Sequence, residues 1–357
     1  MRFEVDASWQ RFDAVVLAGS PLRLFRLTPG GIRVVEQIEA TGEASPSTLV
    51  DRLSDAGAVH PLPVDRRPAR FDLDDVTAVT PQLGGVAHDD GRITVDDGSV
   101  PPIVGARLRL DINRGPAAAR NAARPLVETP LIAFLDADVS TPNPHWAAEL
   151  LWHFDDPRVA LVAPRVCGEM RSPLDLGDQP ARVRAGTRVS YVPGAALVVR
   201  TDALDAIGGF DELLRFGEDV DLVWRLDEAG WRCRYDPAVT VWHEPRDSWQ
   251  ARLRQHAGYG TSAAALAMRH PRALSPLHVN GWTAATWSLA LAGRVPAALA
   301  LGAGSSAALV RKLPDVPPRE SSMLAIRGHL LAGRQFAAAA RRVWWPLLAA
   351  MALVSQR

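Results

Sequence analysis

The stretch AFLDADVST, residues 133–141, sets the fold class because an apolar run ends in two aspartates with one residue between them. Aspartate is depleted inside strands, so Asp136 and Asp138 indicate the place where a buried strand ends. Side chains two residues apart in a strand point to the same face, and two carboxylates this close need a cation or a donor beside them. The stretch therefore predicts a strand whose carboxyl end carries a binding site.

Strand-like and helix-like stretches alternate on both sides of this run. The expected strands are residues 76–80, 93–97, 107–112, 131–138 and 159–164, and the expected helices are residues 116–124 and 145–154. This alternation predicts an α/β domain with a mostly parallel sheet between helices, which binds its ligands at the carboxyl ends of the strands. Residues 81–92 are Gly-rich and too few for a crossover helix, so we expect a loop there.

Length, charge and cysteine content bound the class of protein. The chain has 357 residues, which predicts one main domain of roughly 200 residues with smaller appendages. Its formal charge of zero, with acids and bases interspersed, argues against a nucleic-acid partner. Cys167 and Cys233 are too few for a disulfide framework or a zinc site, which fits a reducing cytoplasm. Charged residues near the N-terminus predict that no export signal is present.

Residues 1–63 have the pattern of a small module with the order strand, helix, helix, strand. Thr28 before Pro29 and Ser45 before Pro46 each predict a helix start, and Gly57 ends the second helix. A DNA-binding winged helix is disfavoured, because acidic side chains would face phosphate. These acids are Glu36, Glu39, Glu43, Asp51 and Asp55. The module resembles winged-helix-like peptide chaperones that present leader peptides in ribosomal-peptide cofactor pathways; a structural cap on the next domain is the alternative.

A Pro- and Arg-rich linker is expected at residues 64–75 and an apolar, membrane-associated helical region at residues 263–357, with a change of composition from residue 279. The apolar runs in this last region are each shorter than the roughly 20 residues that span a bilayer. We therefore expect short hairpin or interfacial helices on the membrane surface, with tryptophans at headgroup level and basic flanks on the cytoplasmic face. These tryptophans are Trp282, Trp287, Trp344 and Trp345. Helices buried against the sheet domain are the alternative.

Three further motifs accompany the Asp136 and Asp138 pair, whose carboxylates suit Mg²⁺ or Mn²⁺ completed by substrate phosphate. Asp96 and Asp97 end another expected strand, where a carboxylate can accept from a uracil ring or a ribose hydroxyl. Asn113 begins a tight turn before a helix that carries Arg120, placed to meet phosphate or base. Ordinary turn and capping chemistry would explain any one of these motifs alone.

The third of these motifs is GGFDELLRFGEDVDLVWRL, residues 208–226. Glu218 and Asp219 stand where a helix begins, and the helix dipole favours the ionised form of a carboxylate there. Asp221 and Arg225 read as an i,i+4 ion pair. Asp219 is the candidate base for an acceptor hydroxyl, and Glu218 is the next candidate.

The motifs VDDGS, NRGPAAARN, FLDAD, GGFDE and GEDVDL, in this order, resemble the inverting family 2 glycosyltransferases with a GT-A fold. This catalytic domain is expected at residues 76–262. The run from about residue 19 to residue 357, including VSYVPGAALVVR and YGTSAAALAMRHP, resembles the mycofactocin-system glycosyltransferases of actinobacteria. This resemblance implies UDP-glucose as the donor and a peptide-derived redox cofactor, extended with glucose, as the acceptor.

The resemblance also implies roles for the motif residues. Asp96 or Asp97 would hold the uracil, Asp136 the ribose and Asp138 the metal, while Asp219 would take the acceptor proton.

Two further residues have open interpretations. His243 ends a strand-like stretch, where such enzymes often have another metal ligand, although a structural histidine is the alternative. Arg254 would steady the leaving diphosphate or coat a membrane-facing helix.

Two other functions stay open: a transferase for cell-wall polysaccharide or lipid-linked sugar, and a non-catalytic scaffold that binds nucleotide sugar or peptide.

Overall fold

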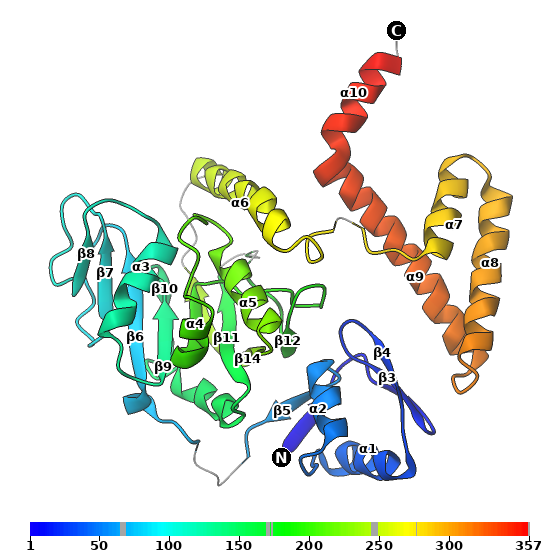
Figure 1. Cartoon of the computed structure of the whole chain (residues 1–357), viewed down its shortest axis with the longest axis horizontal. Helices are drawn as coiled ribbons and strands as arrows, with labels where there is room; N and C mark the ends of the chain where they lie inside the picture. Colours follow the sequence, from blue (N-terminus) through cyan, green and yellow to red (C-terminus); the bar gives the residue numbers. More distant parts are fainter. Residues whose placement is uncertain (65–68, 169–171, 173, 244–248, 276, 356–357) are drawn as a thin grey trace. The chain divides into compact units, whose positions relative to one another are not determined.

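A nine-stranded sheet organises the computed structural model, which describes residues 1–64, 69–168, 172, 174–243, 249–275 and 277–355, without the side chains of residues 249–256, 259 and 352–355. Its order is β10-β14-β11-β13-β9-β6-β7-β8, and β12 pairs with β14 (Figure 1). The strands are β6 (Val76–Gln82), β7 (Ile93–Asp97), β8 (Leu108–Leu110), β9 (Leu131–Leu135), β10 (Val139–Ser140), β11 (Val159–Cys167), β12 (Ala181–Val183), β13 (Ala196–Arg200) and β14 (Arg232–His243).

The sheet is mixed, so the predicted α/β class is confirmed but the predicted mostly parallel sheet is wrong. β6 is parallel to β7 and β9, and β11 is parallel to β14. β13 is antiparallel to both β9 and β11, and β10 and β12 are antiparallel to β14. All of Ala196–Arg200 is buried. A strand buried on both faces shows no alternation in its sequence, and its direction therefore cannot be read from the pattern.

Helices cover both faces of the sheet, and the sheet divides the hydrophobic core into two clusters. On one face lie α3 (Pro116–Ala123), α4 (Thr201–Ala206) and α5 (Glu218–Glu228), and on the other lies the 3₁₀ helix η3 (Ala148–Asp155). Along β9, Ile132 and Phe134 pack toward α3–α5, whereas Leu131, Ala133 and Leu135 pack toward η3. This alternation follows from the two-residue period of a strand.

The first crossover is a loop, as predicted. β6 and β7 are parallel neighbours, and residues 83–92 join them without a helix. Short helical turns occupy other connections, at η1 (Leu73–Asp75) and η2 (Arg124–Leu126), and α6 (Trp249–Arg269) follows β14.

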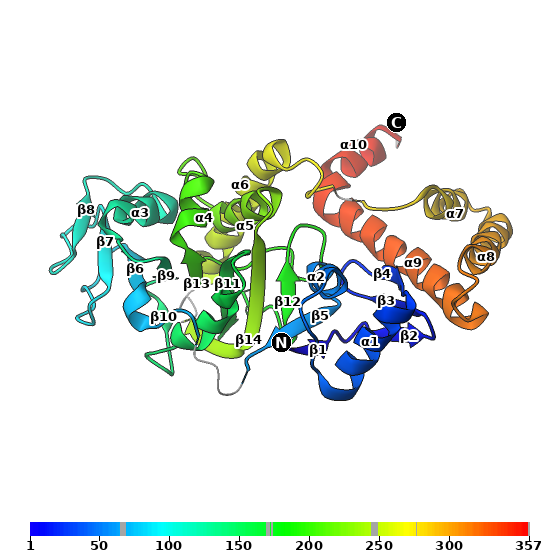
Figure 2. The ribbon, with the colours of Figure 1, turned by 60° about the horizontal axis from the view of Figure 1, so that its bottom comes forward.

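The N-terminal segment contains the predicted strand, helix, helix and strand. β1 (Arg2–Val5) pairs with β5 (Val59–Leu62), and α1 (Pro29–Thr41) and α2 (Thr48–Asp55) lie between them in sequence (Figure 2). A small sheet of β2 (Gln10–Phe12), β3 (Val15–Ala18) and β4 (Arg23–Arg26) was not predicted.

The predicted start of α1 at Pro29 is confirmed, but the predicted start of α2 after Ser45 is wrong. Ser47 caps α2 instead, because its backbone is extended and its hydroxyl accepts from the Val50 amide at 3.3 Å.

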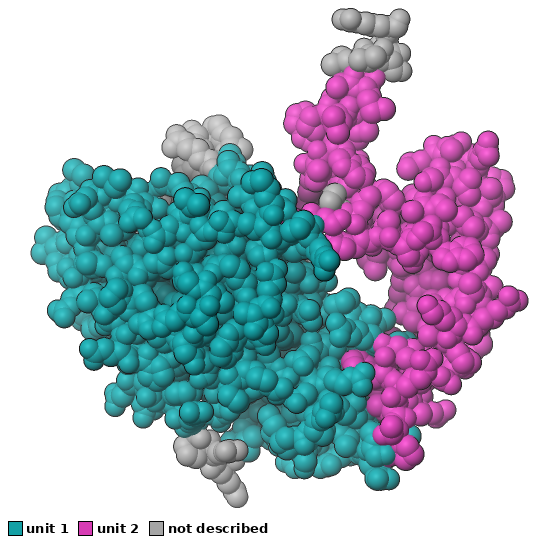
Figure 3. All heavy atoms as spheres, viewed as in Figure 1, with its two compact units in different colours: residues 1–9, 17–23, 30–273 teal, residues 10–16, 24–29, 274–357 magenta. Residues whose placement is uncertain are grey.

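The chain divides into two compact units (Figure 3). One comprises Met1–Trp9, Leu17–Arg23 and Gly30–Ala273, and the other comprises Gln10–Val16, Leu24–Pro29 and Leu274–Arg357. The second unit holds α7 (Gly281–Leu291), α8 (Val295–Lys312), α9 (Pro318–Ala339), the π-helical turn η4 (Ala340–Trp344) and α10 (Trp345–Ser355). Within the described ranges, none of the helices combines the length and the apolar character needed to traverse a bilayer.

Candidate active site

The turn after β7 is built around Asp96, whose side chain is fully buried. It accepts hydrogen bonds from the Ser99 amide at 2.8 Å and the Ile103 amide at 3.0 Å, and it pairs with Arg109. Burial by itself would raise the pKa of the Asp96 carboxyl, but these donors lower it to about 2. Asp96 is therefore ionised at neutral pH, and its carboxylate oxygens already accept hydrogen bonds from the protein.

Asp97 joins this turn to the start of α3. Its carboxylate accepts from the Arg114 amide at 2.7 Å and the Gly115 amide at 2.8 Å. Asn113, in the same segment, accepts from the Arg215 guanidinium. Gly98 makes this junction possible, because a Cβ there would lie 2.4 Å from backbone atoms of residues 112 and 113, and its φ is +74°.

We predict that Gly98→Ala destabilises the protein by roughly 2–4 kcal/mol, since it adds both backbone strain and a backbone clash. Urea unfolding followed by circular dichroism measures this loss. Gly91→Ala is the matched control, because Gly91 has a similar φ of +82° but nothing lies within 4 Å of its Cβ position. Equal destabilisation in the two variants would show that the close contact at Gly98 is unimportant.

Arg120 connects the carboxyl end of β9 to the start of α5. Its guanidinium donates to Asp136 at 2.7 Å, to Glu218 at 3.0 Å and to the Gly194 carbonyl at 3.0 Å. The side chain is buried and its guanidinium lies 5.2 Å from the centre of the Phe210 ring. Arg120 thus binds protein carboxylates within the site, and its predicted contact with phosphate or base stays a prediction.

Glu218 and Asp219 begin α5, as predicted, after Gly217 in a left-handed conformation. Asp219 accepts from the Gly194 amide at 2.9 Å and from the Val220 amide at 2.8 Å. Burial, together with the neighbouring Asp219 charge, raises the pKa of Glu218 to about 7. Burial also raises the pKa of Asp219 despite its amide donors, so the environment offsets the helix-dipole effect expected from the sequence.

The predicted metal ligands Asp138 and His243 come together at the edge of the sheet. β10 pairs with β14 so that His243 lies opposite Val139, and His243 Nε2 is 3.3 Å from Asp138 Oδ2. No group of three or more His, Cys, Asp or Glu suited to a metal occurs among the described residues. A carboxylate and an imidazole nevertheless fit a cation that takes its other ligands from water and substrate phosphate.

One predicted site residue lies outside the described side chains, and one residue of the site was not predicted. The side chain of Arg254, in α6, lies outside the described residues. Gly194 was not predicted as a site residue, although its carbonyl binds Arg120 and its amide binds Asp219. Its only signal in the sequence is its place in the VPGA turn before β13.

Comparison with known proteins gives the family of the chain. The sequence is 37% identical to pre-mycofactocin glycosyltransferase of Mycobacterium tuberculosis over 96% of this chain and 80% of that protein. The chain belongs to the pre-mycofactocin glycosyltransferase family. The family described as glycosyltransferase like family 2 matches residues 107–259. The protein is therefore a family 2 glycosyltransferase, and the predicted family is confirmed.

Other matches of the transferase are shorter or more distant. An N-acetylglucosaminyl-diphospho-decaprenol L-rhamnosyltransferase of Mycobacterium tuberculosis is 38% identical over 22% of this chain and 26% of that protein. Among solved structures, a mannosyltransferase from Pyrobaculum calidifontis in complex with GDP-Man and Mn²⁺ is 21% identical. That match covers 74% of this chain and 91% of the mannosyltransferase, with a TM-score of 0.42.

Proposed function

We propose that the transferase has a GT-A fold and moves glucose, with inversion, from UDP-glucose to the peptide-derived precursor of mycofactocin. The observation that carries this proposal is the position of Arg120, which holds Asp136 and Glu218 on either side of one buried guanidinium. Gly194 ties Asp219 to the same arrangement. The acids at the end of β9 and at the start of α5 thus lie around a common centre.

In the proposed reaction, an acceptor hydroxyl attacks the anomeric carbon of the glucosyl group. The new C–O bond forms as the bond from that carbon to the diphosphate oxygen breaks, and UDP leaves with the electron pair. Asp219 takes the hydroxyl proton, on the side of the sugar opposite the departing diphosphate. Arg120 keeps Glu218 and Asp136 in place by its hydrogen bonds.

Donor binding is assigned to the strand ends. Asp136 would contact the ribose, and the turns organised by Asp96 and Asp97 would border the uracil. A Mg²⁺ or Mn²⁺ ion held by Asp138 and His243 would neutralise the diphosphate as charge develops on it.

The direct test is incubation of the full chain with UDP-glucose, Mn²⁺ and the deglycosylated cofactor, followed by mass spectrometry for added hexose units. Transfer to a lipid-linked sugar instead of the cofactor would support the cell-wall alternative. UDP binding without any transfer to either acceptor would support the scaffold alternative.

We further propose that α10 attaches the transferase to the cytoplasmic face of the cell membrane. Its apolar side chains include Trp345, Leu347, Leu348 and Met351, which are 59%, 66%, 47% and 68% exposed. Arg341 and Arg342 precede them in η4 and suit anionic headgroups. Exposed apolar side chains beside basic residues are typical of helices that lie in the membrane interface.

We predict that removing residues 279–357 shifts the protein from the membrane fraction to the soluble fraction. In the intact chain, the double substitution Leu347→Glu and Leu348→Glu should have the same effect, since it places two charges among the exposed apolar side chains of α10. Co-flotation with vesicles of phosphatidylcholine and phosphatidylglycerol measures the bound fraction. Leu83→Glu with Val86→Glu is the control, because these exposed side chains lie in the β6–β7 loop. Failure of the unaltered chain to float would refute the attachment.

A further inference from the structure

A cavity lies where the N-terminal segment meets the nine-stranded sheet. It has a volume of about 620 Å³ and is lined by residues of β5, β12, β14 and η3, and we call it the seam pocket. Pockets of this size hold small ligands. Arg234 lines the pocket and His243 lies at the other end of the same strand, β14. At about 3.3 Å per residue, the intervening strand separates the seam pocket from the candidate active site by roughly 25–30 Å.

Three arginines of the transferase sheet line the seam pocket. Arg232 and Arg234 are two residues apart on β14, and Arg182 on β12 lies opposite Arg234 in register. Arg232 is 5% exposed and Arg234 is 9% exposed. Burying guanidinium groups is unfavourable unless each finds hydrogen-bond acceptors, so their partners decide what the pocket can bind.

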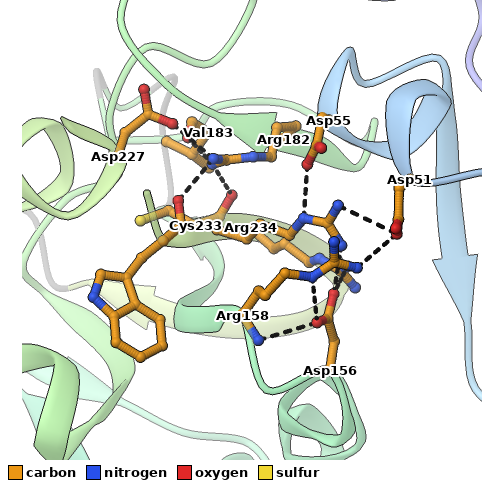
Figure 4. Close-up of polar contacts among 11 residues, drawn as sticks. Asp51, Asp55, Asp156, Arg158, Arg182, Val183, Asp227, Cys233 and Arg234 are labelled. Carbon is orange, nitrogen blue, oxygen red and sulfur yellow. Dashed lines mark hydrogen bonds and ion pairs between the residues drawn. The ribbon is translucent and has the colours of Figure 1, made fainter. Parts of the chain in front are cut away.

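The N-terminal segment supplies partners for some of these groups. Asp51 and Asp55 on α2 point toward the arginines of the sheet (Figure 4). Asp55 accepts from Arg232 Nε at 2.7 Å, and Asp51 accepts from Arg158 at 2.6 Å. Arg232 Nη2 is buried without a hydrogen-bond partner, and Asp51 Oδ1 lies 3.5 Å from it.

Arg234 is less well satisfied than its neighbours. Its two closest polar contacts are Asp156 at 3.3 Å and His153 Nδ1 at 3.5 Å, both long for a guanidinium. Asp156 also pairs with Arg232 at 2.7 Å and with Arg158 at 3.2 Å. Burial lowers the pKa of Arg234 to about 10, and the nearby arginines act in the same direction. At this wall of the pocket, the arginines therefore share the Asp156 carboxylate, and some of their N–H donors lack a close acceptor.

Arg182 differs, because its terminal nitrogens are occupied. They donate to the carbonyls of Val183, Trp231 and Cys233 and to the Asp227 carboxylate (Figure 4). The Nε of Arg182 is buried without a hydrogen-bond partner, like Arg232 Nη2, whereas Arg234 makes only long contacts at the pocket wall.

The remaining walls favour a singly charged ligand with an apolar body. Glu149, Asp178 and Asp236 also line the pocket and would repel a doubly charged phosphate more than a carboxylate. Trp152 and several prolines provide apolar surface. These prolines are Pro61, Pro63, Pro180 and Pro237.

We propose that the seam pocket is a second ligand site, which binds the carboxylate of a short apolar peptide or similar organic acid through Arg232 and Arg234. The carboxylate fills the acceptor positions that Asp156 leaves open, and the apolar body lies against Trp152 and the prolines. The site is separate from the donor site and does not depend on the proposed glucose transfer.

Calorimetry with the full chain tests this site, with N-acetyl-glycyl-phenylalanine as the probe and its C-terminal amide as the matched neutral ligand. We expect the acid to bind about 10- to 100-fold more tightly than the amide, as for hydrogen bonds to charged groups. Arg234→Gln should remove this preference and Arg234→Lys should keep part of it. Arg124→Gln is the control, since Arg124 pairs with Asp205 on another part of the surface.

Equal affinity of the acid and the amide for the unaltered protein would overturn the proposal. That comparison needs no variant and holds even if Arg234→Gln does not fold. Tighter binding of inorganic phosphate than of the acid would overturn the choice of a carboxylate. Displacement of the acid by UDP would overturn the separation from the donor site.

Discussion

Asp219→Asn should lower glucose transfer by about 10²- to 10⁴-fold while the affinity for UDP-glucose stays near that of the unaltered protein. Asparagine keeps the shape of the side chain and can still accept from the Gly194 and Val220 amides through its carbonyl oxygen. It cannot take a proton from the acceptor hydroxyl. Initial rates at saturating UDP-glucose measure the loss of transfer, and calorimetry with UDP-glucose measures donor affinity.

Glu218→Gln distinguishes Glu218 from Asp219, the two acids with which α5 begins. If Asp219 is the base, Glu218 takes no proton from the acceptor hydroxyl. This variant should therefore retain most of the transfer rate. The pKa of Glu218, raised to about 7 by burial and by Asp219, predicts that its ionisation changes near neutral pH. Near-normal turnover of Asp219→Asn with loss in Glu218→Gln would give the base role to Glu218. Loss of donor affinity in Asp219→Asn would place Asp219 in the donor site.

Asp138→Ala should abolish the metal-dependent part of UDP binding. Asp138 and His243 are the protein ligands proposed for the ion, and an imidazole alone holds Mg²⁺ or Mn²⁺ poorly because these cations prefer oxygen. Calorimetry with UDP, with and without Mn²⁺, measures the effect. Asp205→Ala is the matched control, since the Asp205 and Asp138 side chains are 49% and 46% exposed.

The Asp138 result has a clear contrary outcome. If Mn²⁺ strengthens UDP binding equally in Asp138→Ala and in the unaltered protein, Asp138 is not a metal ligand. His243→Ala then tests the other side of the pair, because the two side chains lie 3.3 Å apart.

The strand ends were predictable because their signals are local. Asp96, Asp97 and Asp136 follow apolar runs, and the parallel pairing of β6 with β7 and β9 brings those ends to one edge of the sheet. The helix start at Glu218 was predictable for the same reason, since a glycine precedes it and an apolar stripe follows.

The partners of Arg120 were not predictable from local patterns. Its hydrogen bonds join residues separated by 16, 74 and 98 positions, and only the folded sheet brings them together. β13 was not among the expected strands, and its antiparallel direction could not be read from the sequence because a fully buried strand has the same composition in either direction. Gly194 was missed because its contribution is made by backbone atoms, which every residue has.

The ion pairs between α2 and the sheet predict a pattern of evolutionary change. The Asp55 side chain is 48% exposed, so solvent screens its pair with Arg232. Arg232 is buried and its Nε binds Asp55, which lies 177 positions earlier in the chain. Arg232 also pairs with Asp156 at 2.7 Å, so homologous chains that lack the N-terminal segment should keep Arg232 and Asp156 together, whereas Asp55 and Arg232 should change together only in chains that retain the segment.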